Sequence, residues 1–253
     1  MAKDRTPIRR DGTEQREVDA FLQKVRATPA RAPTGKRGRL IFALDATASR
    51  EPTWDRACHL QAEMFEATAE IGGLDVQLVF YRGFRECKAS PWVADSRALR
   101  DRMTAVHCLG GQTQIGRVLK HALNETRKAK VDAVVFVGDC FEEDVDRVCA
   151  TAGELGLAGV PVFLFHEGGE PVARRAFEQI ARLTGGAYCP FDSASARHLK
   201  DLLGAVAVFA AGGYKALSDY GARTGGDAVA RLTHQVSGRE GGSARGGRGR
   251  SGS

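Results

Sequence analysis

Three short segments of the chain place hydroxyl or carboxylate side chains directly after an apolar run or behind glycines. They are Asp45-Ala46-Thr47-Ala48-Ser49, Gly110-Gly111-Gln112-Thr113, and Asp139 after the apolar residues 134–137. Hard divalent cations such as Mg²⁺ and Mn²⁺ take several oxygen ligands in near-octahedral geometry, more than any one of these segments could supply. A cation held largely by neutral hydroxyls also keeps much of its charge and can bind an acidic group of another molecule. The sequence therefore predicts a cation site made of Asp45, Thr47, Ser49, Thr113 and Asp139.

Short apolar runs alternate with helical patterns over about 170 residues from residue 39. We expect strands at 40–44, 76–81, 85–89, 133–137, 160–165 and 187–191. We expect helices at 54–71, 96–106, 115–127, 142–155, 172–183 and 194–211. This alternation predicts a three-layer, Rossmann-like α/β fold with a mostly parallel sheet of about six strands and helices on both faces. Ligands of such sheets bind at the carboxyl ends of the strands, where the three segments lie.

The two ends of the chain carry the excess of positive charge. Residues 1–38 hold ten Lys or Arg and five Asp or Glu, and residues 237–253 hold four Arg and one Glu, against a net charge of +6 for the whole chain. We expect a basic arm over 1–38 with a short helix at 14–28, a globular domain over 39–212 and a helical extension over 213–236. The Gly/Arg/Ser tail over 237–253 cannot bury apolar surface and is expected to be disordered.

Composition excludes several classes of protein. No apolar run approaches the roughly 18 residues of a membrane span, and the charged N-terminus has no apolar signal segment. The six cysteines have no C-x-x-C pair and no zinc-finger spacing, which favours reduced thiols in a cytoplasmic protein. No glycine-rich phosphate loop follows a strand, so no nucleotide cofactor is indicated.

The three segments resemble the metal-ion-dependent adhesion site of von Willebrand factor A (VWA) domains. That family has D-x-[ST]-x-S after its first strand, a Thr in a later Gly-containing loop and an Asp after a buried strand. The resemblance covers about residues 39–211 and implies that Thr47 and Ser49 bind Mg²⁺ or Mn²⁺ directly. It implies that Thr113 binds directly when a ligand is engaged, and that Asp45 and Asp139 act largely through water.

The resemblance also implies a function. It predicts a non-enzymatic, protein-binding adaptor module in which an Asp or Glu of a partner completes the coordination of the cation. Residues at the rim of the site, Arg50, Trp54 and Gln112, would contact that partner, although core packing is an equal alternative for Trp54. Such modules often work in multiprotein machines, including chelatases and assemblies with AAA-type ATPases. The chain departs from the family at Gly138-Asp139-Cys140, where Thr-Asp-Gly is frequent.

Three other interpretations of the same residues remain open. Asp45, Thr47 and Ser49 could simply cap the following helix. The basic ends could bind RNA or DNA through phosphate contacts.

A haloacid-dehalogenase-like, Mg²⁺-dependent phosphatase would use Asp45 as nucleophile. Its other parts would be Thr113, Lys128 or Lys130, Asp139 and Asp144. Against the phosphatase, Thr47 stands where an acid/base Asp is expected, and a threonine cannot protonate a leaving group as a carboxylic acid can.

Overall fold

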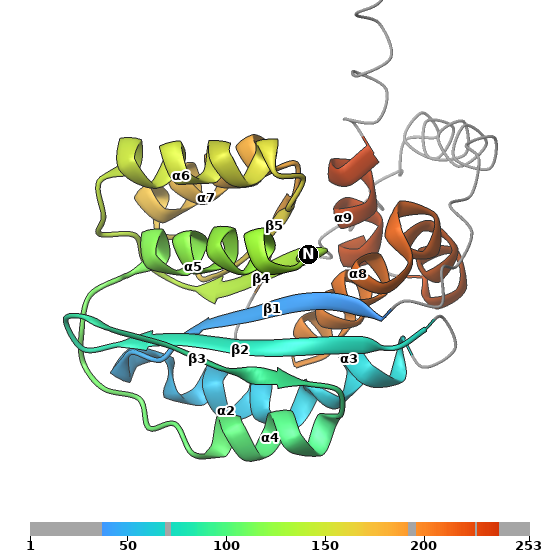
Figure 1. Ribbon diagram of the computed structural model, residues 1–253, viewed down its shortest axis with the longest axis horizontal. Coiled ribbons are helices and arrows are strands. Elements are labelled where there is room, and N and C mark those ends of the chain that lie inside the picture. The colour runs from blue at the N-terminus through green and yellow to red at the C-terminus, as the bar shows by residue number, and fades with distance from the viewer. Residues whose placement is uncertain (1–36, 69–71, 192–195, 226, 238–253) are drawn as a thin grey trace, which may run out of the picture. The chain divides into compact units, whose positions relative to one another are not determined.

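A six-stranded sheet with the strand order β3-β2-β1-β4-β5-β6 forms the middle layer of the fold (Figure 1). Its strands are β1 (Gly38–Asp45), β2 (Leu74–Arg82), β3 (Glu86–Val93), β4 (Ala133–Gly138), β5 (Val162–Glu167) and β6 (Ala187–Phe191). β3 runs antiparallel to β2, whereas all the other neighbouring pairs are parallel. The predicted three-layer fold with a mostly parallel sheet of about six strands is confirmed.

The computed structural model describes residues 37–68, 72–191, 196–225 and 227–237. All of these residues belong to the unit that spans residues 33–253. The helix expected at 14–28 and nearly all of the tail expected at 237–253 lie outside the described residues.

Helices cover both faces of the sheet (Figure 1). One face carries α2 (Glu51–Leu60), α3 (Ala62–Glu66), α4 (Ser96–Thr104) and α8 (Ala196–Thr224), and the other carries α5 (Ile115–Lys128), α6 (Val145–Leu157) and α7 (Pro171–Thr184). Successive side chains of a strand point to opposite faces. In β1, Leu40 and Phe42 accordingly enter the first core and Ile41 the second. The last helix, α9 (Asp227–Ser237), packs against α8 and β6.

Several predicted boundaries are wrong, for identifiable reasons. The helix expected at 54–71 begins earlier, at Glu51, with Pro52 in its first turn, and Gln61 separates α2 from α3. The helix expected from residue 142 begins at Val145, because Asp144 caps it by accepting a hydrogen bond from the Arg147 N–H. The edge strand expected at 85–89 extends to Val93.

The carboxyl ends of the five parallel strands lie together at the left of Figure 1. β1 has β2 on one side and β4 on the other, so the connections from β1 and β4 diverge in opposite directions across the sheet. This divergence marks the topological switch point at which open α/β sheets bind ligands. Asp45, the last residue of β1, and Asp139, the first residue after β4, lie on either side of it.

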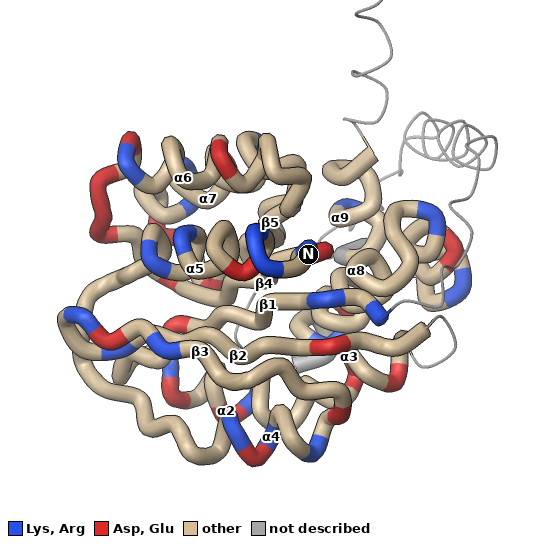
Figure 2. Tube along the Cα trace, viewed as in Figure 1, with Lys and Arg blue, Asp and Glu red and all other residues tan. Residues whose placement is uncertain are grey.

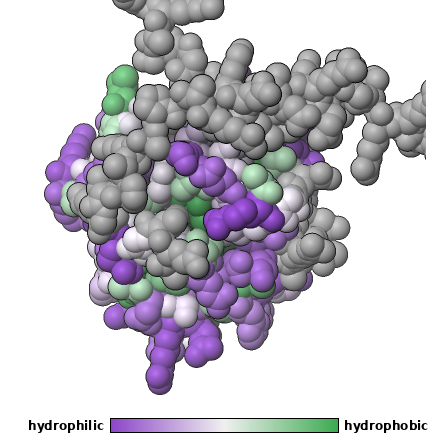
Figure 3. Space-filling model, turned by 90° about the vertical axis from the view of Figure 1, so that its right-hand side faces the viewer, coloured by the Kyte–Doolittle hydropathy of each residue, from purple (hydrophilic) through white to green (hydrophobic). Residues whose placement is uncertain are grey.

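The described surface is mixed in charge and polarity. Figure 2 shows Lys and Arg interspersed with Asp and Glu along the described elements. On the face shown in Figure 3, mostly hydrophilic residues surround small hydrophobic areas among the described atoms. None of the described helices combines the length and apolar character needed to cross a bilayer.

Candidate cation site at the carboxyl edge of the sheet

Asp45 provides a buried carboxylate at the end of β1. The residue is 3% exposed, and its Oδ1 accepts a hydrogen bond from the Thr47 N–H at 2.8 Å. Burial raises the pKa of the Asp45 carboxyl group above its ordinary value, hydrogen bonds from Thr47 lower it, and the negative charge of Asp139 adds to the increase. A nearby cation would relieve the cost of burying this charge.

Thr47 and Ser49 place two hydroxyls beside this carboxylate. Thr47 has an extended backbone (φ −73°, ψ 160°) and precedes a short 3₁₀ turn, η1 (Ala48–Arg50). The two hydroxyl oxygens lie 3.4 Å apart. Neither hydroxyl caps a helix, since the N-cap of η1 (Thr47) and the N-cap of α2 (Arg50) make no side-chain capping hydrogen bond. The capping alternative is therefore wrong for these hydroxyls, which remain available to a ligand.

Asp139 lies across the switch point from Asp45. Its side chain is 25% exposed, and Oδ2 lies 3.8 Å from Nη1 of Arg50. The preceding Gly138 has no room for a side chain, because a Cβ there would lie 2.7 Å from the Phe136 ring. The same Cβ would lie 3.8 Å from the Cβ of Asp45, which places the two segments side by side.

Thr113 is held against the loop that follows β4. The Thr113 hydroxyl accepts a hydrogen bond from the Glu142 N–H at 2.9 Å, and the Glu142 carboxylate accepts one from the Thr113 N–H at 3.2 Å. On the other side, Gly111 packs directly on the β2–β3 turn, since a Cβ there would lie 2.2 Å from the Gly83 carbonyl oxygen. The structure thus brings Thr113 to the loop of Asp139, three residues from that carboxylate along the chain.

The donor set fits a hard divalent cation. Two carboxylates and three hydroxyls are oxygen ligands of the kind that Mg²⁺ and Mn²⁺ prefer. Among the described residues there is no cluster of three or more His, Cys, Asp or Glu side chains arranged to hold a metal. A cation at this edge would therefore depend on the hydroxyl groups of Thr47, Ser49 and Thr113.

Two of the three residues expected at the rim are buried. The Arg50 side chain is 4% exposed and forms an ion pair with Glu167, and Trp54 is 3% exposed. The Trp54 indole N–H donates to the Met103 carbonyl at 3.1 Å, a bond that joins α2 to α4. The rim expectation is wrong for the side chains of Arg50 and Trp54, whereas Gln112 is exposed.

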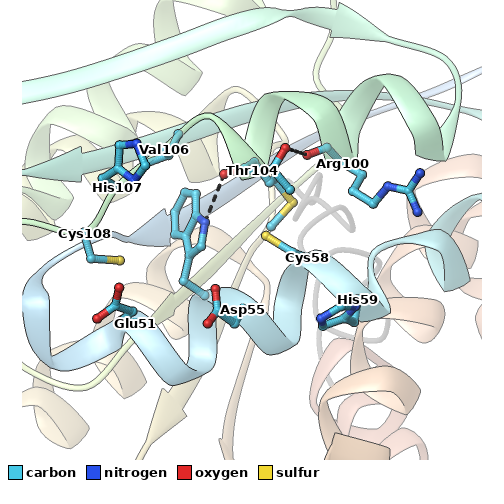
Figure 4. Close-up of a pocket in the computed structure, with 11 residues that line it drawn as sticks. Glu51, Asp55, Cys58, His59, Arg100, Thr104, Val106, His107 and Cys108 are labelled. Atoms are coloured by element: carbon cyan, nitrogen blue, oxygen red, sulfur yellow. Dashed lines mark hydrogen bonds between the residues drawn. The ribbon is translucent and has the colours of Figure 1, made fainter.

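A pocket of about 240 Å³ opens beside the site between α2, α4 and residues 106–108. Figure 4 shows Glu51 and Asp55 on α2 facing the segment that carries His107 and Cys108. Burial raises the pKa of the Cys108 thiol to about 11, so this thiol is protonated at neutral pH and a poor nucleophile.

Three ionisable residues at this edge were not expected from the sequence. Glu167 ends β5 and accepts a hydrogen bond from the Thr53 hydroxyl at 2.5 Å. Glu143 accepts hydrogen bonds from the first N–H groups of α5, and burial raises its pKa. Burial raises the pKa of the Tyr81 phenol well above 10, and the charge of Asp45 adds to this effect. The position of Glu167 at a strand end was the signal that could have identified it.

The lysines that a phosphatase would need lie at the opposite edge of the sheet. Lys128 pairs with Glu125 and Lys130 with Asp132, and the Arg39 side chain bonds to the backbone between the two lysines. Arg39 is the second residue of β1 and Asp45 the last, which separates the two edges by about 20 Å at 3.3 Å per residue. Asp144 caps α6 instead. The structure does not assemble the expected phosphatase site.

No family model matches the chain, and no curated protein matches it in sequence. Solved structures match it in fold. A von Willebrand factor type A structure from Catenulispora acidiphila has a TM-score of 0.55 and 14% identity, covering 68% of this chain and 42% of that one. The SpRpn10 VWA domain has a TM-score of 0.53 and 13% identity, covering 67% of this chain and 95% of that one. Proximal thread matrix protein 1 from the mussel byssus, with a zinc-occupied MIDAS motif, has a TM-score of 0.52 and 18% identity, covering 70% and 48%.

These matches define the fold of the chain as that of von Willebrand factor A domains. The chain spans less than half of the Catenulispora structure and almost all of the isolated SpRpn10 domain. At these identities the likeness concerns the fold, and the chemistry of the site has to be argued from the residues of this chain.

Proposed function

We propose that this chain is a protein-binding module that engages an Asp or Glu of a partner through a divalent cation at the carboxyl edge of its sheet. One observation carries the proposal. The hydroxyls of Thr47 and Ser49 lie 3.4 Å apart beside a buried carboxylate, and neither of them caps a helix. Two hydroxyls that cap no helix, next to a desolvated negative charge, are the arrangement expected of a cation site.

The five residues would have two different roles in such a site. Thr47, Ser49 and Thr113 would supply neutral oxygen ligands, and Asp45 and Asp139 would supply negative charge. When bound, Mg²⁺ or Mn²⁺ would supply a positive charge only partly neutralised by the chain. The Glu142 N–H orients the Thr113 hydroxyl, and the Thr47 N–H orients the Asp45 carboxylate. The result is a pre-organised surface for one acidic side chain, with no group assigned to making or breaking a bond.

The surroundings of the site favour a partner with apolar side chains near its acidic residue. Phe84, on the β2–β3 turn, is 76% exposed, and Leu109 is 48% exposed. The Leu109 N–H donates to the Ala46 carbonyl at 3.0 Å, and the turn of Phe84 bonds to Gln112 through Gly83. These backbone hydrogen bonds hold the segments of Leu109 and Phe84 against the loops that carry the candidate ligands. Exposed apolar side chains beside a polar centre are typical of binding surfaces.

The first test is a calorimetric titration of the purified protein with Mn²⁺. We expect one weak site in the wild-type protein and none in Asp45→Asn, which removes the charge but keeps the shape of the side chain. Asp101→Asn is the matched control, because Asp101 is an exposed carboxylate on α4, away from the carboxyl edge. Wild-type protein that binds no Mn²⁺ at millimolar concentration would contradict the proposal.

The second test uses peptides that carry one Glu among apolar residues, each with a Gln counterpart. We expect the Glu peptides to bind in Mg²⁺ and to be released by a chelator, whereas the Gln peptides do not bind in either condition. Equal binding of both sets would rule out recognition of a carboxylate. Hydrolysis of a phosphate ester by the wild-type protein, lost in Asp45→Asn, would instead support the phosphatase.

A further inference from the structure

Arg50 is buried beside Asp139, at one side of the candidate site. Its guanidinium pairs closely with Glu167 through Nη1, and the same nitrogen lies 3.8 Å from Oδ2 of Asp139. The Arg50 side chain is 4% exposed, and its Nε has no hydrogen-bond partner within the described part of the chain. A buried, incompletely paired guanidinium therefore reaches one of the carboxylates proposed to hold the cation.

Glu167 is held in place independently of Arg50. Its Oε2 accepts the hydrogen bond from the Thr53 hydroxyl at 2.5 Å and also faces the guanidinium. Thr53 belongs to α2 and Glu167 to β5, so this bond joins two elements far apart in sequence. Glu167 is thus a fixed anion that can keep Arg50 away from Asp139.

The Arg50–Glu167 pair contributes to the net formal charge of the candidate site. Asp45, Asp139 and Glu167 contribute three carboxylates and Arg50 one guanidinium, which leaves a formal surplus of two negative charges. A divalent cation would balance this surplus. The guanidinium and the cation would nevertheless share Asp139, and like charges near one carboxylate repel each other.

We propose that Arg50 is an internal competitor of the divalent cation for Asp139, and that Glu167 sets the affinity of the site by holding Arg50 back. Arg50 and Glu167 are then positioning residues and not ligands. This inference rests on the proposed function because it concerns the same site. It adds the prediction that a change at the end of β5 controls cation binding at the ends of β1 and β4.

The test compares Mn²⁺ affinity in four proteins by calorimetry: wild type, Glu167→Gln, Arg50→Met, and the double variant Arg50→Met/Glu167→Gln. In Glu167→Gln the guanidinium loses its main anion and turns to Asp139, so Mn²⁺ should bind about tenfold more weakly. In Arg50→Met the competitor is gone, and Mn²⁺ should bind about tenfold more tightly. Lys215→Met, which removes an exposed cation on α8, is the control and should leave the affinity unchanged.

The double variant separates competition from simple charge counting. It has the same formal charge at the site as the wild type but lacks the guanidinium. Direct competition predicts that it binds Mn²⁺ more tightly than the wild type, whereas long-range charge alone predicts equal affinity. If Arg50→Met alone fails to fold, the double variant still tests the inference. It replaces the ion pair by a neutral pair and therefore leaves no buried charge unpaired.

The outcomes distinguish this inference from the proposed function. Equal affinity of the double variant and the wild type overturns the competition and leaves the proposed function intact. Mn²⁺ binding by the double variant but not by the wild type supports the competition and contradicts a cation-dependent function of the natural chain. If all four proteins are folded and none of them binds Mn²⁺, both the competition and the proposed function are contradicted.

Discussion

The Thr113 hydroxyl accepts a hydrogen bond from the Glu142 N–H at 2.9 Å, and the Glu142 carboxylate accepts one from the Thr113 N–H at 3.2 Å. This reciprocal pair joins the loop before α5 to the loop after β4. Because the hydroxyl oxygen has a second lone pair, Thr113 can serve the backbone and a cation at the same time.

Replacing Thr113 tests this double role. Thr113→Val keeps the shape but removes the acceptor for the Glu142 N–H, so we expect a loss of about 1 kcal/mol in the free energy of unfolding. We also expect weaker Mn²⁺ binding. Thr113→Ser keeps the hydroxyl and should retain both properties, as measured by denaturant unfolding and calorimetry. A Val variant with wild-type Mn²⁺ affinity would exclude Thr113 as a ligand.

The two adjacent glycines of the same loop make a matched pair. A Cβ at Gly111 would lie 2.2 Å from the Gly83 carbonyl oxygen, whereas a Cβ at Gly110 meets nothing within 4 Å. We expect Gly111→Ala to cost about 1–3 kcal/mol of stability, because the β2–β3 turn must shift. Gly110→Ala should be nearly neutral. Thermal unfolding of the two variants gives the comparison, and equal melting temperatures would contradict the close approach of the loops.

Asp45→Asn should stabilise the metal-free protein. Burial raises the pKa of Asp45, which means that the folded state carries this ionised carboxylate at a cost. Removing the charge should raise the melting temperature by about 2–4 °C, corresponding to about 1 kcal/mol for a domain of this size. Scanning calorimetry in a chelator measures the change. A lower melting temperature than in the wild type would show that Asp45 stabilises the fold without any cation.

His166 should make stability fall in mild acid. The ring is 0% exposed, packs edge-to-face on Phe177, and bonds to the Tyr188 hydroxyl and the Asp139 carbonyl. Burial lowers the pKa of His166 below its ordinary value of 6.5, so the unfolded chain binds the proton more tightly than the folded chain. Stability is then retained above pH 6.5 and lost as the pH falls below it.

The measurement for His166 is the melting temperature as a function of pH between 7.5 and 5. His166→Gln keeps a hydrogen-bonding side chain but cannot titrate in this range, so its melting temperature should depend less steeply on pH than that of the wild type. Identical pH profiles would show that His166 does not cause the loss of stability. His121, whose pKa burial also lowers, remains in both proteins and cancels in the comparison.

The layers and most strands of the fold could be predicted from the sequence because they depend on periodicity alone. β6 has the expected bounds, and β4 and α5 each extend one residue further than expected. The start of α6 was predicted wrongly. The helix was expected from residue 142, but it begins at Val145 because Asp144 is its N-cap. Such local hydrogen bonds are weak signals in a sequence, because an Asp has several equivalent uses.

The location of the candidate ligands at the carboxyl edge of the sheet could be predicted, because each of them lies at a strand end or in a loop with a recognisable spacing. The neighbours of the ligands could not. Arg50 follows Ser49 directly and looked like a rim residue, yet its side chain turns inward to Glu167, more than a hundred residues away in sequence. Trp54 likewise turns toward Met103. Which way a side chain turns depends on tertiary contacts that no local pattern contains.

The interruption of α8 at Gly213 has a practical consequence. Gly213 has φ 71° and ψ −165°, a conformation that favours glycine, and it redirects the chain before the helix resumes. Beyond this bend, Leu217, Leu232 and Val236 are at most 7% exposed and belong to the same core as β1. A recombinant fragment that stopped at Gly212 would leave part of that core open to water and would be prone to aggregate, so the shortest fragment suitable for expression has to reach Ser237.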